Sequence, residues 1–565
     1  MGHCRGVAAA SRLRDLFLAA LPLAAASCTG SQYSGDADRD VAGVLEEFDR
    51  RALADRASRV QMPALLPEPP PPVPERERDG AAPRSAYEFD ESAAVQAPAA
   101  ANEPAREPLV LDLKTALSIA VERSRRFKDQ KESLYLTGMG FTVTKFNYGP
   151  QFSSAVSFVW GDGDGASATS SAGGSFGVSQ LLPTNGSVSL SAGLTKAWAR
   201  DDGGAGGDWS TSTGINLTQP LLRRAGYDLY REGLTQAERS LVYSVRAFER
   251  FREQFTIDIT QQYFGLVGQK RQIANSEHDL ESATFDQDKT EALAFVGRLA
   301  ETDVISTRRR RIDAESQVED RRTAFRRAVQ SFLIDLGLDP STPVELKEEE
   351  PPFEPVRFDP VSAVQVALAT RLDVQTERDR FDDAERQFRL ARNDLLPDLD
   401  LTASYSSSGA GNRPGGALPD TWSRSAGVSL EIPLQTIQRR NAWRQAEISI
   451  EQTRRNWTQY LDSEKSRIED ALREVRNTER QIELAEQSIV DEEKNVDRLE
   501  IQFERVSGRD LVEARQKLVD RRNGLIEAKV RHLIQRLTLY MNLGILFIGR
   551  DGNWSVGTPA SEDVR

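Results

Sequence analysis

The chain has 565 residues, a mean hydropathy of −0.50 and a formal net charge of −13. This hydropathy excludes a protein made of several membrane-spanning helices, and the acidic balance disfavours nucleic acid as a partner. With two cysteines and three histidines, the chain cannot form a disulfide framework and has little material for a metal centre or for acid–base catalysis. The composition by itself is that of an acidic, helix-rich, water-soluble protein.

Residues 1–27 have the pattern of a secretory signal peptide. Three arginines precede an apolar stretch at 16–26, which is too short for a stable membrane anchor and ends in small residues directly before Cys28. A cysteine in this position resembles the acylation site of bacterial lipoproteins, so we expect Cys28 to carry lipid and become the first residue. The alternative is cleavage near Ala26 with an unmodified Cys28. Loss of three Arg and one Asp with the leader changes the charge from −13 to −15.

Residues 28–108 show no apolar period and are rich in Pro, Ala and Glu. Six prolines fall between positions 67 and 74. Proline-rich segments of this kind are extended spacers. We therefore expect residues 28–108 to form a lipid-anchored tether that provides reach and makes no packing contacts.

Beyond residue 108 the sequence repeats itself at constant offsets. The segment LDLKTA at 111–116 is matched by FDPVSA at 358–363, 247 positions later, and Pro150 and Pro397 are also 247 positions apart. Near the end of each copy, TDV at 302–304 is matched by RDL 207 positions later. These offsets indicate an internal duplication.

The first copy is longer than the second by 40 residues. Most of the excess lies in one interval, since Pro150 to Pro220 is 70 residues and its counterpart, Pro397 to Pro433, is 36. We assign residues 109–345 to the first copy, 356–549 to the second and 550–565 to a C-terminal tail. A unit of this length is a duplicated half-domain and not a solenoid repeat.

Each copy opens with helical spacing, at 112–146 and at 360–395, and the period then changes to two. The second copy predicts two strands. The first copy predicts two strands and an added hairpin across 174–198. Apolar residues of one parity define these strands: Phe152, Val156, Phe158, Trp160, Val188, Leu190, Ala192, Leu194, Ile215, Leu217, Leu399, Leu401, Ala403, Tyr405, Val428, Leu430 and Ile432.

Two long helices follow the strands. Residues 227–296 and 436–506 contain no proline and almost no glycine. About 70 helical residues span ~105 Å at ~1.5 Å per residue. Each helix is followed by a short break and a second helix, so each copy predicts a long antiparallel coiled-coil hairpin.

Strands with apolar residues on one parity and polar residues on the other are typical of a membrane-spanning β-barrel, whose signal hardly appears in the overall hydropathy. Four tryptophans lie in or beside the strands, as interfacial aromatics would. Four to six strands cannot close a barrel, and an open edge is not tolerated in lipid, so the chain must oligomerise. The alternative is a soluble sandwich packed over the helices. The tryptophans are Trp160, Trp198, Trp209 and Trp422.

The ordered set of motifs resembles the TolC-like outer-membrane efflux protein family, in its lipoprotein subtype. The motifs are DLKTAL at 112–117, QPLL at 219–222, VGRLAETDV at 296–304 and DLVEA at 510–514. The resemblance covers residues 109–549. It implies a mainly α fold with a β-barrel portion, built from a duplicated helix–strand–helix–helix unit. The assembly would be a homotrimeric channel in the outer membrane of a diderm bacterium, with a helical tunnel in the periplasm.

The resemblance also implies candidate gate residues. Asp510 and Glu513 would form an acidic ring at the periplasmic aperture, and Thr302 and Asp303 would receive bonds that hold the aperture shut. The alternative without a functional role is that Asp510 and Glu513 lie at a solvated helix start and that Asp303 is only a helix cap. The family's partner tyrosine would fall near Phe503, which has no hydroxyl.

The resemblance further implies a periplasmic adaptor protein and an inner-membrane transporter as partners. Gly297 and Gly508, at the hairpin tips, would contact the adaptor, or would simply be turn glycines. No cofactor, metal site or catalytic set is expected, so the chain is not expected to be an enzyme.

The expected function is export of small molecules, such as drugs and toxic compounds, through a tripartite efflux system. Alternatives are the duct of a type I protein secretion system and a coiled-coil envelope scaffold or adhesin. His532 lies on a helical seam and is expected to be a core histidine. The arginine run 308–311 is expected to be a salt-bridged helix face.

Overall fold

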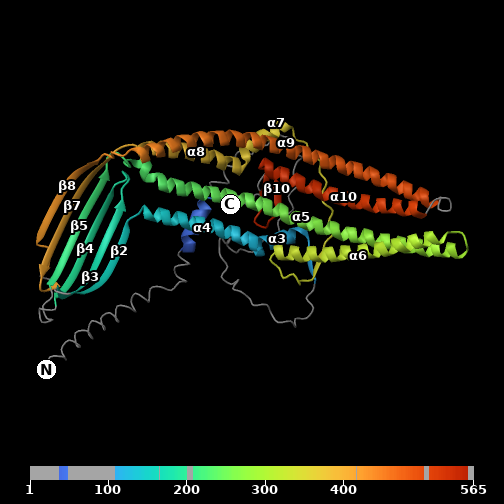
Figure 1. Cartoon of the computed structure of the whole chain (residues 1–565), viewed down its shortest axis with the longest axis horizontal. Coiled ribbons are helices and arrows are strands. Elements are labelled where there is room, and N and C mark those ends of the chain that lie inside the picture. The colour runs from blue at the N-terminus through green and yellow to red at the C-terminus, as the bar shows by residue number, and fades with distance from the viewer. Residues whose placement is uncertain are drawn as a thin grey trace, which may run out of the picture.

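The structure is a computed structural model, and it describes residues 37–48, 108–163, 166–199, 208–414, 417–501 and 508–557. The molecule is elongated, with a curved sheet at one end and two long helical hairpins that run away from it (Figure 1). None of the described helices has the length and apolarity that crossing a bilayer requires.

Each copy opens with two helices that lie end to end. Asp112 and Asp359 cap the first helix of each pair, because their carboxylates accept the N–H of Thr115 at 2.7 Å and of Ser362 at 3.1 Å. The two caps are 247 positions apart, as the duplication requires. The helices are α3 Leu113–Arg123, α4 Arg125–Asn147, α7 Pro360–Thr370 and α8 Leu372–Asn393.

The sequence predicted one unbroken helix in each of these places, and this is wrong at one residue per copy. Ser124 and Arg371 have ψ angles of 128° and 129°, which interrupt the helix. Neither residue is a proline or a glycine, so local propensity does not mark the break. The break is a packing feature, since Gly337 and Gly544, both with positive φ, lie directly against it.

The sheet has six antiparallel strands in the order β2-β3-β4-β5-β7-β8. The added hairpin predicted across 174–198 is confirmed as β3 and β4, which together extend beyond those bounds. Strands β2 and β8 are the two edges of the sheet. The strands are β2 Gln151–Gly163, β3 Ala166–Leu181, β4 Ser187–Ala199, β5 Asp208–Pro220, β7 Asp398–Gly411 and β8 Thr421–Glu431.

The two predicted hairpins are present, one in each copy. Helix α5 (Tyr227–Phe295, 69 residues) returns as α6 (Glu301–Asp335), and α9 (Ile437–Ile501, 65 residues) returns as α10 (Gly508–Leu543). Helix α10 also packs along α5, so the two hairpins lie side by side (Figure 1).

The largest apolar cluster lies in the middle of the molecule, where α3, α4, α5 and α6 of the first copy meet α10 of the second. It includes the buried side chains of Leu117, Phe127 and Tyr263. Four short strands border it, which the sequence did not predict. They are β1 Leu109–Leu111, parallel to β6 Val344–Leu346, and β9 Leu546–Ile548, antiparallel to β10 Trp554–Val556.

Part of the expected tether does pack. Residues 37–48 form a helix whose Val41, Leu45 and Phe48 are buried against α4 and α5. Phe48 contacts Phe141 edge to face, with ring centroids 5.4 Å apart. The expectation of no packing is therefore wrong for this segment, because three apolar residues at a spacing of three to four place one hydrophobic face on the helix.

Candidate functional site

The first hairpin ends in a glycine turn. Gly297 has a φ of +74°, its N–H donates to Ala294 O, and the N–H of Arg298 donates to Leu293 O, both at 2.9 Å. This is a Schellman motif, which glycine favours because it adopts positive φ without steric cost. An added Cβ at Gly297 would contact nothing within 4 Å, so the turn leaves open space around its backbone.

The predicted gate residues of the first copy lie at the start of the returning helix α6. Thr302 is exposed and Asp303 is half-buried in the first turn of α6. An acidic residue there is stabilised by the helix dipole. The carboxylate of Asp303 does not cap α6, whose N-cap residue is Ala300 and carries no side-chain capping bond.

The predicted gate residues of the second copy lie at the start of α10. Gly508 is its first residue, Asp510 is exposed in the first turn, and Glu513 pairs with Lys517 at 2.8 Å. Both hairpin tips lie at the end of the molecule farthest from the sheet (Figure 1). Phe503 and the expected lipidation site, Cys28, lie outside the described residues.

One arginine near the tips connects three helices, and the sequence analysis missed it. Arg515 of α10 donates to Asp286 of α5 at 2.6 Å and to Glu500 of α9 at 2.8 Å. The Asp286 side chain is 5% exposed, and burial raises its pKa above the usual value although Arg515 partly opposes the change. Arg515 therefore holds the two hairpins together through one charge-assisted contact.

A second buried carboxylate lies two helical turns along α5. Asp279 pairs with Arg310 of α6 at 2.7 Å, and their side chains are 5% and 10% exposed. Burial also raises the pKa of Asp279. The expected salt-bridged face at 308–311 is therefore correct for Arg308 and Arg311, whose partners are Glu291 and Glu315, whereas Arg310 points into the hairpin.

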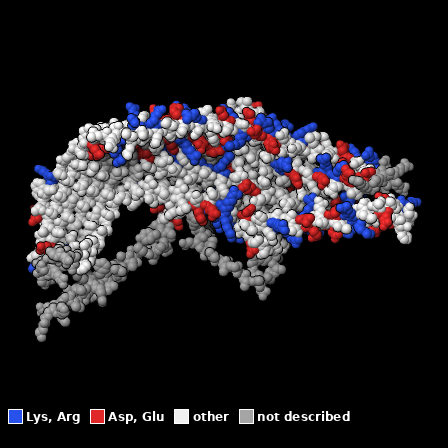
Figure 2. Space-filling view, viewed as in Figure 1, with Lys and Arg blue, Asp and Glu red and all other residues white. Residues whose placement is uncertain are grey.

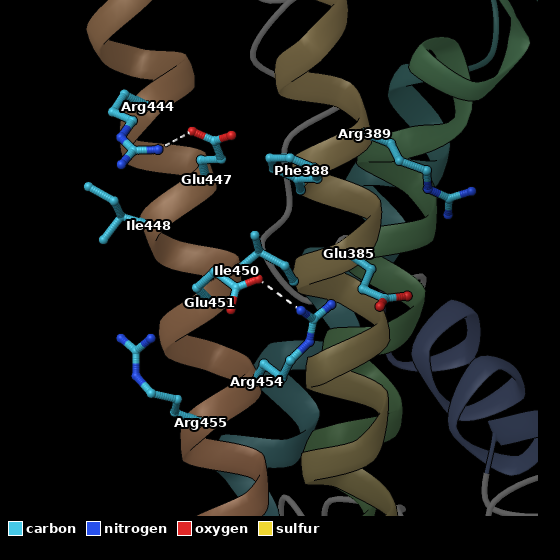
Figure 3. A pocket seen from close by; sticks show the side chains of 10 residues that line it. All are labelled: Glu385, Phe388, Arg389, Arg444, Glu447, Ile448, Ile450, Glu451, Arg454 and Arg455. Carbon is cyan, nitrogen blue, oxygen red and sulfur yellow. Dashed lines mark hydrogen bonds and ion pairs between the residues drawn. The ribbon is translucent and has the colours of Figure 1, made fainter.

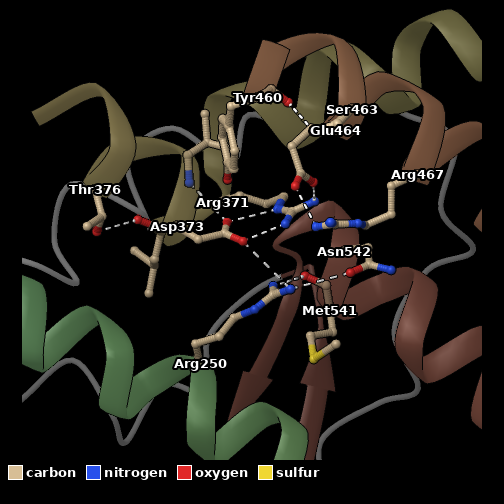
Figure 4. A network of polar contacts seen from close by, with 12 residues as sticks. Arg250, Arg371, Asp373, Thr376, Tyr460, Ser463, Glu464, Arg467, Met541 and Asn542 are labelled. Carbon is tan, nitrogen blue, oxygen red and sulfur yellow. Dashed lines mark hydrogen bonds and ion pairs between the residues drawn. The ribbon is translucent and has the colours of Figure 1, made fainter. Parts of the chain in front are cut away.

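A polar network joins the copies at the break between α7 and α8 (Figure 4). The Arg371 side chain is fully buried and donates to Asp373 and to Glu464 of α9, which is 1% exposed. Arg250 of α5 reaches Asp373 at 3.8 Å and donates to the carbonyl oxygen of Met541 at 3.1 Å. Hydrogen bonding from Arg371 and the charge of Arg250 lower the pKa of Asp373 in spite of its burial.

A groove of about 900 Å³ lies between α8 and α9 (Figure 3). Phe388 and Ile448 line it among charged residues, and Phe388 stacks on Trp443 with ring centroids 4.7 Å apart. Two of its ion pairs, Arg444–Glu447 and Arg454–Glu451, form along α9 itself.

The register of the sheet separates two chemically different faces. One face carries the apolar residues and all four tryptophans, and it is exposed, as at Val156 with 85% of its surface accessible. Lys196 lies over the rings of Trp198 and Trp209, at 5.1 and 5.2 Å from their centroids. Figure 2 shows that charged side chains gather on the helices and are few on the side of the sheet seen in this view.

The opposite face carries short hydroxylated residues and glycine. Cross-strand hydroxyl pairs confirm the shared face, with Ser404 and Ser425 2.7 Å apart and Ser406 and Ser423 3.1 Å apart. Residues of this face on all six strands are Ser153, Ser157, Ser171, Ser175, Ser189, Ser191, Thr195, Ser210, Ser212, Thr402, Ser404, Ser406, Ser408, Ser423, Ser425 and Ser429.

His532 is a core histidine, as its place on the seam predicted. It is 1% exposed, its Nδ1 lies 3.3 Å from the Thr478 hydroxyl, and burial lowers its pKa. Within the described part of the chain, no cluster of His, Cys, Asp or Glu side chains has the arrangement of a metal site.

Residues 363–545 match the family model of the outer membrane efflux protein. Among solved structures, the chain is similar to the CmeC outer membrane channel of Campylobacter jejuni, at 15% identity over 88% of this chain and 96% of that chain, with a TM-score of 0.58. It is also similar to the outer membrane protein VceC of Vibrio cholerae, at 14% identity over 76% of this chain and 96% of that one, with a TM-score of 0.56.

The MtrE outer membrane channel of Neisseria gonorrhoeae shows the same likeness, at 12% identity over 76% of this chain and 88% of that one, with a TM-score of 0.55. No curated protein matches the chain. At these identities the structures show the fold, while the family model covers most of the second copy. Residues 363–545 therefore resemble the outer membrane efflux protein, and the chain has the fold of these outer membrane channels, as its motifs predicted.

Proposed function

We propose that this protein is the outer-membrane channel of a tripartite efflux system and exports small molecules. The observation that carries the proposal is the joining of a two-faced sheet to two long helical hairpins in one duplicated chain. A sheet that is apolar on one face and hydroxylated on the other is suited to separate lipid from a water-filled pore. The hairpins would extend that pore into the periplasm.

The proposed assembly is a homotrimer in the outer membrane, anchored in addition by lipid on Cys28. The edges of the sheet support oligomerisation, because β2 and β8 present unpaired backbone groups that lipid cannot satisfy. A periplasmic adaptor would contact the tips at Gly297 and Gly508, and an inner-membrane transporter would supply the energy. The open space around Gly297 permits close approach of a partner's backbone.

The proposed gate lies at the hairpin tips. Asp510 and Glu513 are three residues apart on α10 and so share a face of the helix. In a trimer they would line a narrow opening with negative charge and favour cations. Thr302 and Asp303 lie in the first turn of α6, in the neighbouring hairpin. Arg515, bound to Asp286 and Glu500, would keep the two hairpins in the closed arrangement.

The test uses the full chain, extracted from outer membranes and inserted in planar bilayers. We expect a trimer whose closed state conducts weakly and prefers cations, and we expect Asp510→Ala with Glu513→Ala to raise the conductance several-fold and reduce the cation preference. A matched control is Asp382→Ala with Glu385→Ala, which removes two exposed carboxylates at the same spacing from α8. Equal conductance of both double variants would contradict the gate, and a soluble, non-conducting rod would contradict the channel.

A further inference from the structure

The first copy contributes four strands to the sheet and the second contributes two. The correspondence between the copies shows which strands are additional. Strand β7 follows Pro397 as β2 follows Pro150, and β8 precedes α9 as β5 precedes α5. Strands β3 and β4 therefore have no counterpart, and they are inserted between β2 and β5 in the sheet as well as in the chain.

The inserted hairpin is paired with its neighbours along nearly its whole length. Strand β3 pairs with β2 from Ala166 to Ser179, and β4 pairs with β5 from Ser187 to Ala197. Its apolar residues fall on the same face as those of the other strands, as Phe176 lies between Ser154 and Ala192 in the register. The hairpin is therefore part of the wall of the sheet and not a loop that folds over one face.

The turn of the inserted hairpin is bound to the junction between sheet and helices. The Nδ2 of Asn185 donates to the carbonyl oxygen of Arg224 at 2.6 Å. The N–H of Gly226 donates to the carbonyl oxygen of Thr184 at 3.3 Å. Asn185 and Arg224 are the described non-glycine residues with positive φ, both at 64°. Such conformations persist where surrounding contacts hold them. The junction thus has specific contacts for the inserted hairpin.

The free edges of the sheet are compatible with each other. Strand β2 runs away from the helices and β8 runs back toward them, so β8 of one copy meets β2 of the next in antiparallel orientation. Both edges carry large apolar residues on the same face, including Trp160 on β2 and Trp422 on β8. Pairing of these edges satisfies the unpaired backbone groups and continues both faces without a break.

We propose that three copies close a barrel of eighteen strands through β8–β2 pairing, and that the inserted hairpin β3–β4 widens the exit duct. The inference rests on the proposed trimeric channel, with three copies of a six-stranded sheet. At ~4.8 Å between strands and a tilt of ~40°, eighteen strands give a backbone diameter of ~36 Å. Twelve strands, as a trimer without the hairpin would supply, give ~24 Å.

The lining in the central part of this duct fits passage of bulky solutes without selection by charge. In the central part of the sheet the inner face is mostly serine, threonine and glycine, so its side chains there are short and neutral, while Asp398, Asp400 and Glu431 lie on the same face at the helix-side end. Short side chains leave most of the backbone diameter open. Selection by charge would then occur at the hairpin tips and at the helix-side end of the barrel, and not along its central wall.

The test measures distances between equivalent residues of the trimer by double electron–electron resonance. Nitroxide labels are attached to Ser175→Cys on β3 and, separately, to Ser406→Cys on β7, both exposed on the hydroxylated face. The unsubstituted chain, labelled in parallel, measures any background from Cys28. Threefold symmetry gives a distance of about 0.87 diameters, so we expect ~31 Å between backbones at both sites, against ~21 Å for twelve strands.

A deletion of residues 164–199, which removes the inserted hairpin, should shorten the Ser406→Cys distance by about 10 Å in the trimer, as expected for six fewer strands. If the deletion variant does not fold, the distances in the full chain still decide. A conducting trimer with ~21 Å at Ser406→Cys, or with a shorter distance at Ser175→Cys than at Ser406→Cys, overturns the wide barrel alone. Absence of a conducting trimer overturns the proposed function instead.

Discussion

The two copies of the repeat share their backbone plan but differ at corresponding positions. Ser124 in the first copy and Arg371 in the second both occupy the break between paired helices, and only Arg371 carries a buried charge network. On α4 of the first copy, Phe141 contacts the helix at 37–48, while its counterpart on α8, Phe388, lines the open groove between α8 and α9. The first copy also has the added hairpin.

These differences show what the repeat requires and what it leaves free. The capping aspartates, the break and the positive-φ glycines that end each returning helix occur in both copies, because each stabilises a part of the backbone course that the copies share. Charges in the interior, the covering of the grooves and the number of strands differ, because each can be added to one copy without changing the backbone of the other. The second copy is the simpler version.

The largest expected effect concerns the break. Arg371→Met leaves Glu464 buried with only Arg467 as a partner, and loss of one member of a buried ion pair costs about 3–5 kcal/mol. Ser124→Ala, at the corresponding position, should cost less than about 1 kcal/mol because the Ser124 side chain makes no capping bond. The temperature at which the detergent-solubilised protein unfolds measures both. Similar losses in the two variants would show that the network adds nothing to the second copy.

An intermediate effect is expected at three glycines with positive φ that end helices, Gly297 after α5, Gly337 after α6 and Gly544 after α10. Alanine at any of Gly337, Gly544 and Gly297 places a side chain at positive φ, which costs about 1–2 kcal/mol. At Gly337 the added Cβ would overlap the carbonyl oxygen of Arg123, and at Gly544 it would lie 2.8 Å from the Thr370 hydroxyl, while nothing lies near Gly297. The melting temperature should therefore fall most for Gly337→Ala and least for Gly297→Ala. The reverse order would contradict the close packing of Gly337 and Gly544 against the helix breaks at Ser124 and Arg371.

The smallest effect is a dependence on pH. Burial raises the pKa of Asp286 above 3.8, so the folded carboxyl keeps its proton at a higher pH than the unfolded one. Its contribution to stability is present below the unfolded pKa and is lost as the pH rises through the folded value. As the pH falls from 7 toward 4, the melting temperature of the unsubstituted protein should therefore rise relative to that of Asp286→Asn.

The matched control for this pH series is Glu493→Gln, at the position of α9 that corresponds to Asp286. Glu493 pairs with Arg522, and both side chains are 44% exposed. The control separates the effect of burial from that of losing one negative charge. A difference between Asp286→Asn and the unsubstituted protein that does not change with pH would contradict a raised pKa.

The sequence by itself determined the duplication, the order of the elements and the family motifs. These features depend on patterns that are local in the chain, such as period two in the strands and period 3.6 in the helices. The long helices were predicted to within a few residues, since no proline interrupts 227–296 or 436–506. The candidate gate residues Thr302, Asp303, Asp510 and Glu513 were proposed from the resemblance of the tip motifs to the family, and they lie in the first turns of the returning helices.

Only the tertiary structure decided which residues pair across the copies. Arg515 is one of many arginines in the chain, and no local pattern shows that it contacts Asp286, 229 positions away. The break at Arg371 and the packing of the helix at 37–48 likewise depend on surfaces that are distant in sequence. The order of the strands places the added hairpin within the sheet. The alternation of side chains in the sequence predicts strands but does not say which strands pair with each other, so only the structure shows this order.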